Sequence, residues 1–105
     1  MFSYLLILLT FLISPNQSLS ETRLDFYMND FYTKSKQASK ILKEIETNLK
    51  KGSRENVCSR QREAGKLGLL ANKSLIKAFE LEGAEPPMEA IKSNEKRWES
   101  ILNDC

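Results

Sequence analysis

Two cysteines are the residues of this 105-residue chain whose chemistry is easiest to define from their positions. Cys58 lies near the middle of the chain, and Cys105 is its last residue. Their separation is too long for the Cys-x-x-Cys pair of a redox enzyme, and it fits no zinc-binding pattern. A disulfide within one chain is therefore expected, although a bond to another chain or a free, reactive thiol would also suit a terminal cysteine.

Catalytic residues of the common kinds are missing from the sequence, which contains no histidine. The usual acid–base group of neutral pH, the Ser-His and Cys-His nucleophile pairs, and the Glu-x-x-His motif of di-iron bundles are therefore excluded. Carboxylates occur in pairs at Glu80 and Glu82 and at Glu85 and Glu89, but this pattern is typical of a solvated helix end. The sequence predicts no catalytic site, no metal site and no cofactor.

Positive charge is concentrated in one part of the chain, although the formal net charge is only +2. Residues 34–66 hold ten Lys and Arg against four Glu, and they include the expected turn between the first two helices. Such a block can bind anionic lipid headgroups, a polyanion or an acidic protein face, or it can simply keep the protein soluble. Nucleic acid is not expected, because no aromatic residues interleave with the charges. The candidate basic surface comprises Lys50, Lys51, Arg54, Arg60 and Arg62.

The beginning of the chain has the layout of a secretory signal peptide. Residues 5–13 are almost wholly apolar, and Ser18 and Ser20 supply the small residues of a cleavage site. Because no Lys or Arg precedes the apolar run, a retained membrane anchor is the alternative, but a spanning helix needs roughly 20 apolar residues. We expect residues 1–20 to be a signal peptide, and residues 21–105 to form a domain that is secreted or periplasmic/luminal.

The rest of the chain shows the apolar spacing of helices, with steps of three and four residues. No stretch alternates with the period of two that a strand requires. Gly52 and Gly83 supply helix stops, and Ser53 is a suitable N-cap for the second helix. Two consecutive prolines announce the third helix, because proline is tolerated at a first helical position. The expected helices cover about 22–51, 54–82 and 87–103.

Short connections make consecutive helices antiparallel, so the expected fold class is all-α. The arrangement is a small up-down-up three-helix bundle, or a helical hairpin with a third helix added.

Two glycines interrupt the second helix, at a cost of roughly 1 kcal/mol each relative to alanine. Folding the first helix back sets Ser35 near Gly68 and Ala38 near Gly65, and folding the third helix back brings Trp98 near the same glycines. We therefore interpret Gly65, Gly68 and Trp98 as a helix-packing notch rather than a ligand groove. The Gly-x-x-Gly spacing is not a phosphate loop, because no strand precedes it.

The two cysteines come within reach of each other only if the end of the chain leaves the third helix. Two ideal helices leave an axial mismatch of about 9 Å between them, which exceeds the Cα separation of roughly 4.4–6.8 Å that a disulfide allows. Extension of residues 103–105 at about 3.3 Å per residue closes this gap. We therefore predict a Cys58–Cys105 disulfide that staples the C-terminus to the bundle.

The expected function follows mainly from the exclusion of catalytic and metal-binding sets of residues. The chain is predicted to be an exported, non-enzymatic helical interaction module that binds a protein partner, either as a monomer or as a homodimer. The alternative is binding to a membrane surface or a polyanion through the basic turn between the first two helices. Asn72 begins an N-glycosylation sequon, but its position in the middle of a packed helix favours a chance occurrence.

Overall fold

The computed structural model describes residues 15–105, and in that range the chain forms three α-helices and no strand. Most of the predicted signal peptide, residues 1–14, lies outside the described residues. None of the helices in the described part of the chain is long and apolar enough to cross a membrane. The helices are α2 (Pro15–Lys50), α3 (Val57–Glu82) and α4 (Met88–Asn103).

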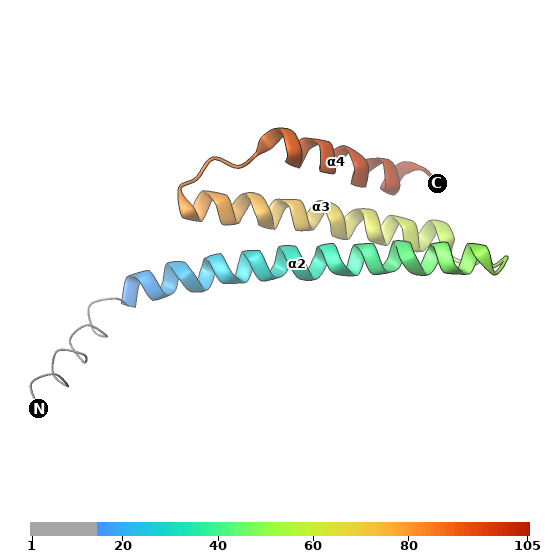
Figure 1. The fold of residues 1–105 in the computed structure, drawn as a ribbon, viewed down its shortest axis with the longest axis horizontal. Coiled ribbons are helices and arrows are strands. Elements are labelled where there is room, and N and C mark those ends of the chain that lie inside the picture. The colour runs from blue at the N-terminus through green and yellow to red at the C-terminus, as the bar shows by residue number, and fades with distance from the viewer. Residues whose placement is uncertain (1–14) are drawn as a thin grey trace, which may run out of the picture.

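The three helices lie side by side, with α3 between α2 and α4, and the chain runs up, down and up through them (Figure 1). The Ser74 hydroxyl on α3 donates to the Asp30 carboxylate on α2 at 2.5 Å. On the other side of α3, the Asn94 amide of α4 donates to the Asn72 side-chain oxygen at 3.1 Å. The middle helix therefore joins the two outer helices, which contact each other much less.

The α2 helix begins earlier than the expected start at residue 22. It starts at Pro15, where the missing proline N–H costs no hydrogen bond, because the first amides of a helix have no partner within it.

The connection between α2 and α3 is fixed by backbone hydrogen bonds. Gly52 has a φ of 80°, and its N–H donates to the Leu49 carbonyl at 3.0 Å. The Ser53 N–H donates to the Asn48 carbonyl at 2.9 Å, which completes the pair of bonds of a Schellman motif. Ser53 thus belongs to the end of α2, and the prediction that it caps the second helix is wrong. That helix begins after Asn56, which has a φ of 58° and makes no capping hydrogen bond with its side chain.

The second connection repeats this chemistry. Gly83 has a φ of 69°, and its N–H donates to the Glu80 carbonyl at 3.1 Å. The Ala84 N–H donates to the Phe79 carbonyl at the same distance. Pro87 then occupies the position before the first residue of α4. The helix therefore begins at Met88, one residue later than expected.

The core is small, and half of its buried hydrophobic side chains are alanine. Trp98, which is 6% exposed, joins α4 to residues of the other two helices. Because alanines fill much of this core, the helices can approach closely. The central cluster comprises Ala38, Ile41 and Ile45 of α2, Ala64 of α3, and Trp98 of α4.

The glycines of α3 form the floor on which α4 packs. A Cβ added at Gly65 would lie 2.8 Å from the Leu102 Cβ, and a Cβ added at Gly68 would overlap the Trp98 indole at Cγ, Cδ2 and Cε2. The absence of side chains at these two positions lets the indole and the α4 backbone approach the α3 backbone.

The Trp98 indole, which the register of the third helix placed beside the glycines, lies against Gly68. The register of the first helix predicted that Ser35 and Ala38 would also lie beside these glycines. The atoms closest to a Cβ added at either glycine belong to α4 instead. Counting residues from a turn predicts the level at which two helices meet. It does not predict which side of the middle helix each neighbour occupies.

Substitution of Gly68 by alanine is expected to destabilise the protein by about 1–3 kcal/mol through overpacking. The loss should occur although alanine favours a helix by roughly 1 kcal/mol, because the new methyl group would occupy the space of the indole. Urea unfolding of Gly68→Ala measures the effect. In a Trp98→Leu background the same substitution should cost less, and a single variant as stable as the parent would contradict the close approach.

Cys58 and Cys105 form a disulfide, as predicted, with their Cα atoms 5.5 Å apart. The α4 helix ends at Asn103, so Cys105 lies beyond the helix, and both cysteines are exposed. Close by, the Gln61 side-chain amide donates to the Ile101 carbonyl at 2.9 Å. The disulfide suggests an oxidising, extracytoplasmic environment.

Asp30 is the acidic group that links α2 to α3. Its carboxylate accepts hydrogen bonds from the Lys34 ammonium group and from the Ser74 hydroxyl. The pKa of Asp30 lies below its ordinary value of 3.8. The hydrogen bond from Lys34 is the largest cause of this shift, and the hydrogen bond from Ser74 is the second. Both contacts favour the charged carboxylate in the folded state.

The stabilisation that Asp30 provides is expected to disappear in acid. Because the pKa is lower in the folded chain than in the unfolded chain, the contribution is complete above the unfolded value, and it is lost as the pH falls through that value and then through the lower folded value. Urea unfolding of the parent and of Asp30→Asn should therefore give a stability difference that is constant near neutral pH and shrinks over this range. A difference that grows in acid would contradict the assignment.

Candidate interaction surface

The acidic residues singled out in the sequence do not come together as a reactive site. Glu80 forms an ion pair with Lys77 at 3.5 Å, and Glu82, Glu85 and Glu89 are exposed. Among residues 15–105 there is no group of three or more His, Cys, Asp or Glu that could hold a metal ion.

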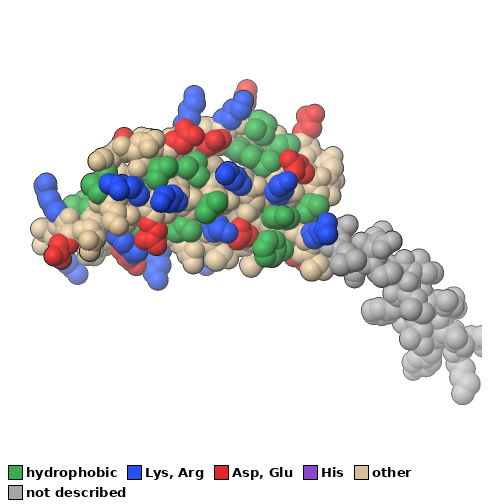
Figure 2. All heavy atoms as spheres, turned by 180° about the vertical axis from the view of Figure 1, so that it is seen from behind, with side chains coloured by type: hydrophobic (Ala, Val, Ile, Leu, Met, Phe, Trp, Pro, Cys, Tyr) green, Lys and Arg blue, Asp and Glu red, His purple; other side chains and the backbone are tan. Residues whose placement is uncertain are grey.

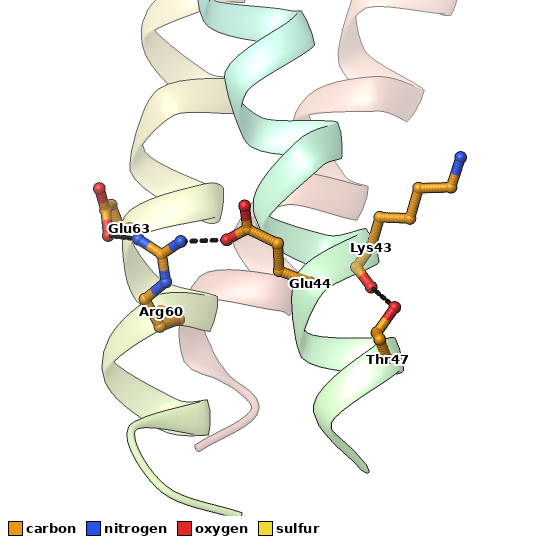
Figure 3. Close-up of polar contacts among 5 residues, drawn as sticks. All are labelled: Lys43, Glu44, Thr47, Arg60 and Glu63. Atoms are coloured by element: carbon orange, nitrogen blue, oxygen red, sulfur yellow. Dashed lines mark hydrogen bonds and ion pairs between the residues drawn. The ribbon is translucent and has the colours of Figure 1, made fainter. Parts of the chain in front are cut away.

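Arg60, one of the five residues of the candidate basic surface, is engaged in ion pairs with acidic residues (Figure 3). Its guanidinium group donates to Glu44 of α2, and to Glu63 of its own helix at 3.0 Å. The hydrogen bond to Glu44 is the main reason why the pKa of Arg60 is raised. Arg60 thus ties α2 to α3, and its charge is largely matched by two carboxylates.

The remaining cations of the candidate basic surface are exposed, and none of them shares the ion pairs of Arg60. Lys50 forms an ion pair with Glu46 at 3.2 Å. Arg62 follows Arg60 by two residues, which places it about 200° further around the helix. Lys51 and Arg54 lie on the exposed connection between α2 and α3. Arg60 and Arg62 therefore lie on different sides of α3.

A larger basic face lies on the side of α2 and α3 that is turned away from the core. At 100° per residue, Lys66, Lys73 and Lys77 lie within about 40° of the direction directly opposite Gly68, which packs against α4. By the same measure Lys36, Lys40 and Lys43 lie within about 40° of the direction opposite the fully buried Ala38. Figure 2 shows this side of the molecule, with Lys and Arg side chains spread along it and apolar side chains between them. We call this surface the outer face; it comprises Lys36, Lys40, Lys43, Lys66, Lys73 and Lys77, together with Arg62, which lies about 60° from the direction opposite Gly68.

Most of the cations on the outer face have no acidic partner. Within residues 15–105, only Lys77 among its seven members takes part in an ion pair. The carboxylates of Glu44 and Glu63 form ion pairs with Arg60. The outer face therefore carries an excess of positive charge that the protein itself does not neutralise.

Exposed apolar side chains occupy one end of the outer face, near the beginning of α2. Phe26 is 64% exposed and Leu81 is 40% exposed, and both line a pocket of about 690 Å³ between α2 and α3. Tyr27 also lines it, and the Phe26 and Tyr27 rings meet edge to face with centroids 5.4 Å apart. We call it the aromatic pocket; it is lined by Thr22, Arg23, Phe26, Tyr27, Lys77, Glu80 and Leu81.

The sequence contains a signal for one wall of the aromatic pocket, although the whole pocket does not follow from it. The apolar seam of the first helix passes through Leu24, Met28 and Phe31, and Phe26 falls outside that seam. A large aromatic residue away from the buried side of an amphipathic helix is a candidate for binding. What the sequence could not supply was Leu81, which reaches the same place from another helix.

Asn72, the first residue of the glycosylation sequon, is 4% exposed. Its side-chain oxygen accepts the hydrogen bond from Asn94, and its side-chain nitrogen, the atom that would carry a glycan, is buried in the folded chain. The sequon therefore provides no modification site in this fold.

Comparison with known proteins gives no assignment for this arrangement. No protein-family model, no curated protein and no solved structure matches the chain.

Proposed function

We propose that this chain is an exported, non-enzymatic interaction module that binds a protein partner at the aromatic pocket. The exposure of Phe26 beside Leu81 is the observation that carries the proposal. Large apolar side chains left in water around a hollow, with polar side chains at its rim, are typical of protein-binding sites. Export is supported by the apolar segment at residues 5–13 and by the Cys58–Cys105 disulfide.

The partner can be captured by a photoreactive residue placed at position 81. The variant protein is added to the extracytoplasmic fraction of the source cells and irradiated, and the product is identified by mass spectrometry. The dissociation constant of the purified partner is then measured for the parent and for two variants, Phe26→Ser and Tyr32→Ser.

Loss of Phe26 should weaken the complex by about 30-fold, the value that corresponds to a binding hot spot of roughly 2 kcal/mol. Tyr32 is a matched control, because it is an aromatic residue of the same helix that is 62% exposed and lies outside the pocket. The Tyr32→Ser variant should lose much less affinity than Phe26→Ser does. Equal affinities for the parent and Phe26→Ser would refute the proposed site.

The alternative function is binding to a membrane surface or polyanion through the turn between α2 and α3. It has less support, because Lys50 and Arg60 are already paired with carboxylates. The Lys50→Glu, Lys51→Glu double variant should leave binding to anionic vesicles and to dextran sulfate unchanged. A large loss of binding would favour this alternative.

A further inference from the structure

We infer that the partner presents an acidic helical segment, which lies along the outer face with an apolar side chain at one end inserted into the aromatic pocket. This inference rests on the proposed function, since it describes the segment that occupies the same site. It extends the contact from the pocket to the cations of α2 and α3.

The charge of the outer face selects an acidic occupant. Six of its cations have no ion pair within the described chain, and its nearest carboxylates are already engaged. A basic or neutral segment would leave these charges unmatched or repel them, whereas carboxylates along the segment would complement them. The six cations are Lys36, Lys40, Lys43, Arg62, Lys66 and Lys73.

The dimensions of the face suit a helix of about five turns. From Phe26 to Lys43 the rise along α2 is about 26 Å, at 1.5 Å per residue. An occupant of this length would begin at the aromatic pocket and end level with Arg62, because Glu44 of α2 lies opposite Arg60 of α3. Leu70, which is 45% exposed, lies between Lys66 and Lys73 and offers a second apolar contact on the way.

An acidic protein segment fits this face better than an anionic bilayer does. A bilayer surface is bound by apolar side chains that protrude into it, whereas Phe26 and Leu81 line a hollow that receives a side chain. In addition, Glu44, Glu63 and Glu80 lie among the cations of the face, where they would be pressed against the lipid phosphates. A segment one helix wide can place its carboxylates on the free lysines and avoid these groups.

The inference can be tested with two synthetic helical peptides of about 18 residues. Each carries a leucine near one end, followed by charged residues at helical spacing, and the charges are Glu in one peptide and Lys in the other. Binding of the disulfide-bonded protein is measured by fluorescence anisotropy at several salt concentrations. Vesicles of phosphatidylserine, with phosphatidylcholine vesicles as reference, are measured in parallel.

The acidic peptide is expected to bind, and binding should weaken with added salt because the contacts on the face are exposed. The Lys36→Gln, Lys40→Gln, Lys43→Gln variant should bind about tenfold more weakly, since each exposed ion pair contributes less than 1 kcal/mol. The matched control is Lys51→Gln, Lys92→Gln, Lys96→Gln, which removes the same charge from exposed positions outside the outer face. This control should bind nearly as the parent does.

Three results would overturn the inference: equal binding of the two peptides, equal losses in the two triple variants, or binding to phosphatidylserine vesicles without binding to the acidic peptide. The proposed function is decided separately by the captured partner. If Phe26→Ser abolishes its binding while the lysine variant does not affect it, the pocket stands and the acidic segment is wrong. If the peptide covalently trapped at position 81 is acidic and both variants weaken its binding, both proposals stand.

Discussion

Reduction of the Cys58–Cys105 disulfide is expected to lower the free energy of unfolding by about 4 kcal/mol on the chain-entropy model. The bond joins residues 47 positions apart, so it removes much of the freedom of the unfolded chain. For a small domain with net stability of roughly 5–15 kcal/mol, this loss is a large fraction of the total. Urea unfolding with and without reductant, followed by circular dichroism, measures it.

The Cys58→Ser, Cys105→Ser double variant is the control for this experiment. It should match the reduced parent and should not respond to reductant. On a gel without reductant, the parent should run as a monomer that migrates faster than its reduced form. A dimer that disappears on reduction, or an unchanged unfolding midpoint, would contradict a stabilising bond within one chain.

Replacement of Trp98 by alanine is expected to cost about 3–5 kcal/mol, the range for removal of a large buried aromatic side chain. The indole is 6% exposed, lies against Gly68, and contributes to the cluster that joins all three helices. Without it, the floor formed by the two glycines would be left as a cavity that no neighbouring side chain can easily fill. Unfolding in urea measures the change.

Two observations check the burial on which this prediction rests. The emission of Trp98 in the folded parent should be shifted to the blue of its emission in the unfolded chain, and Trp98→Phe should lose less stability than Trp98→Ala. Folded-state emission at the unfolded wavelength would show that the ring is in water. A Trp98→Ala variant as stable as the parent would show that the ring contributes no packing energy.

Features that depend only on residues adjacent in the sequence were the easiest to predict. Gly52 and Gly83 end helices because each adopts a left-handed conformation that glycine accepts without strain, and this preference is local. The prediction that Ser53 caps the second helix was wrong because its N–H donates to a carbonyl of the preceding helix. The sequence pattern does not show with which of two helices a residue between them forms hydrogen bonds.

The disulfide was predictable because chain length and helix rise fix axial positions. The sequence did not predict which side of each helix faces which neighbour, since this depends on how the three helices pack in space. This is why Ser35 and Ala38 were expected beside the glycines, where the nearest residues are Trp98 and Leu102, and why the pairing of Arg60 with Glu44 on another helix was missed. The aromatic pocket was missed for the same reason, because Phe26 and Leu81 meet only after α2 and α3 have paired.

The position of the disulfide also gives the chain an unequal covalent topology. The bond closes a ring that contains α3 and α4, and α2 stands outside this ring. Only the exposed connection at residues 51–56 links α2 to it covalently. If that connection straightens, α2 of one copy can pair with the ring of a second copy and keep every contact it makes with α3. Exchange of α2 is therefore the route by which this fold would form a domain-swapped dimer without breaking its disulfide.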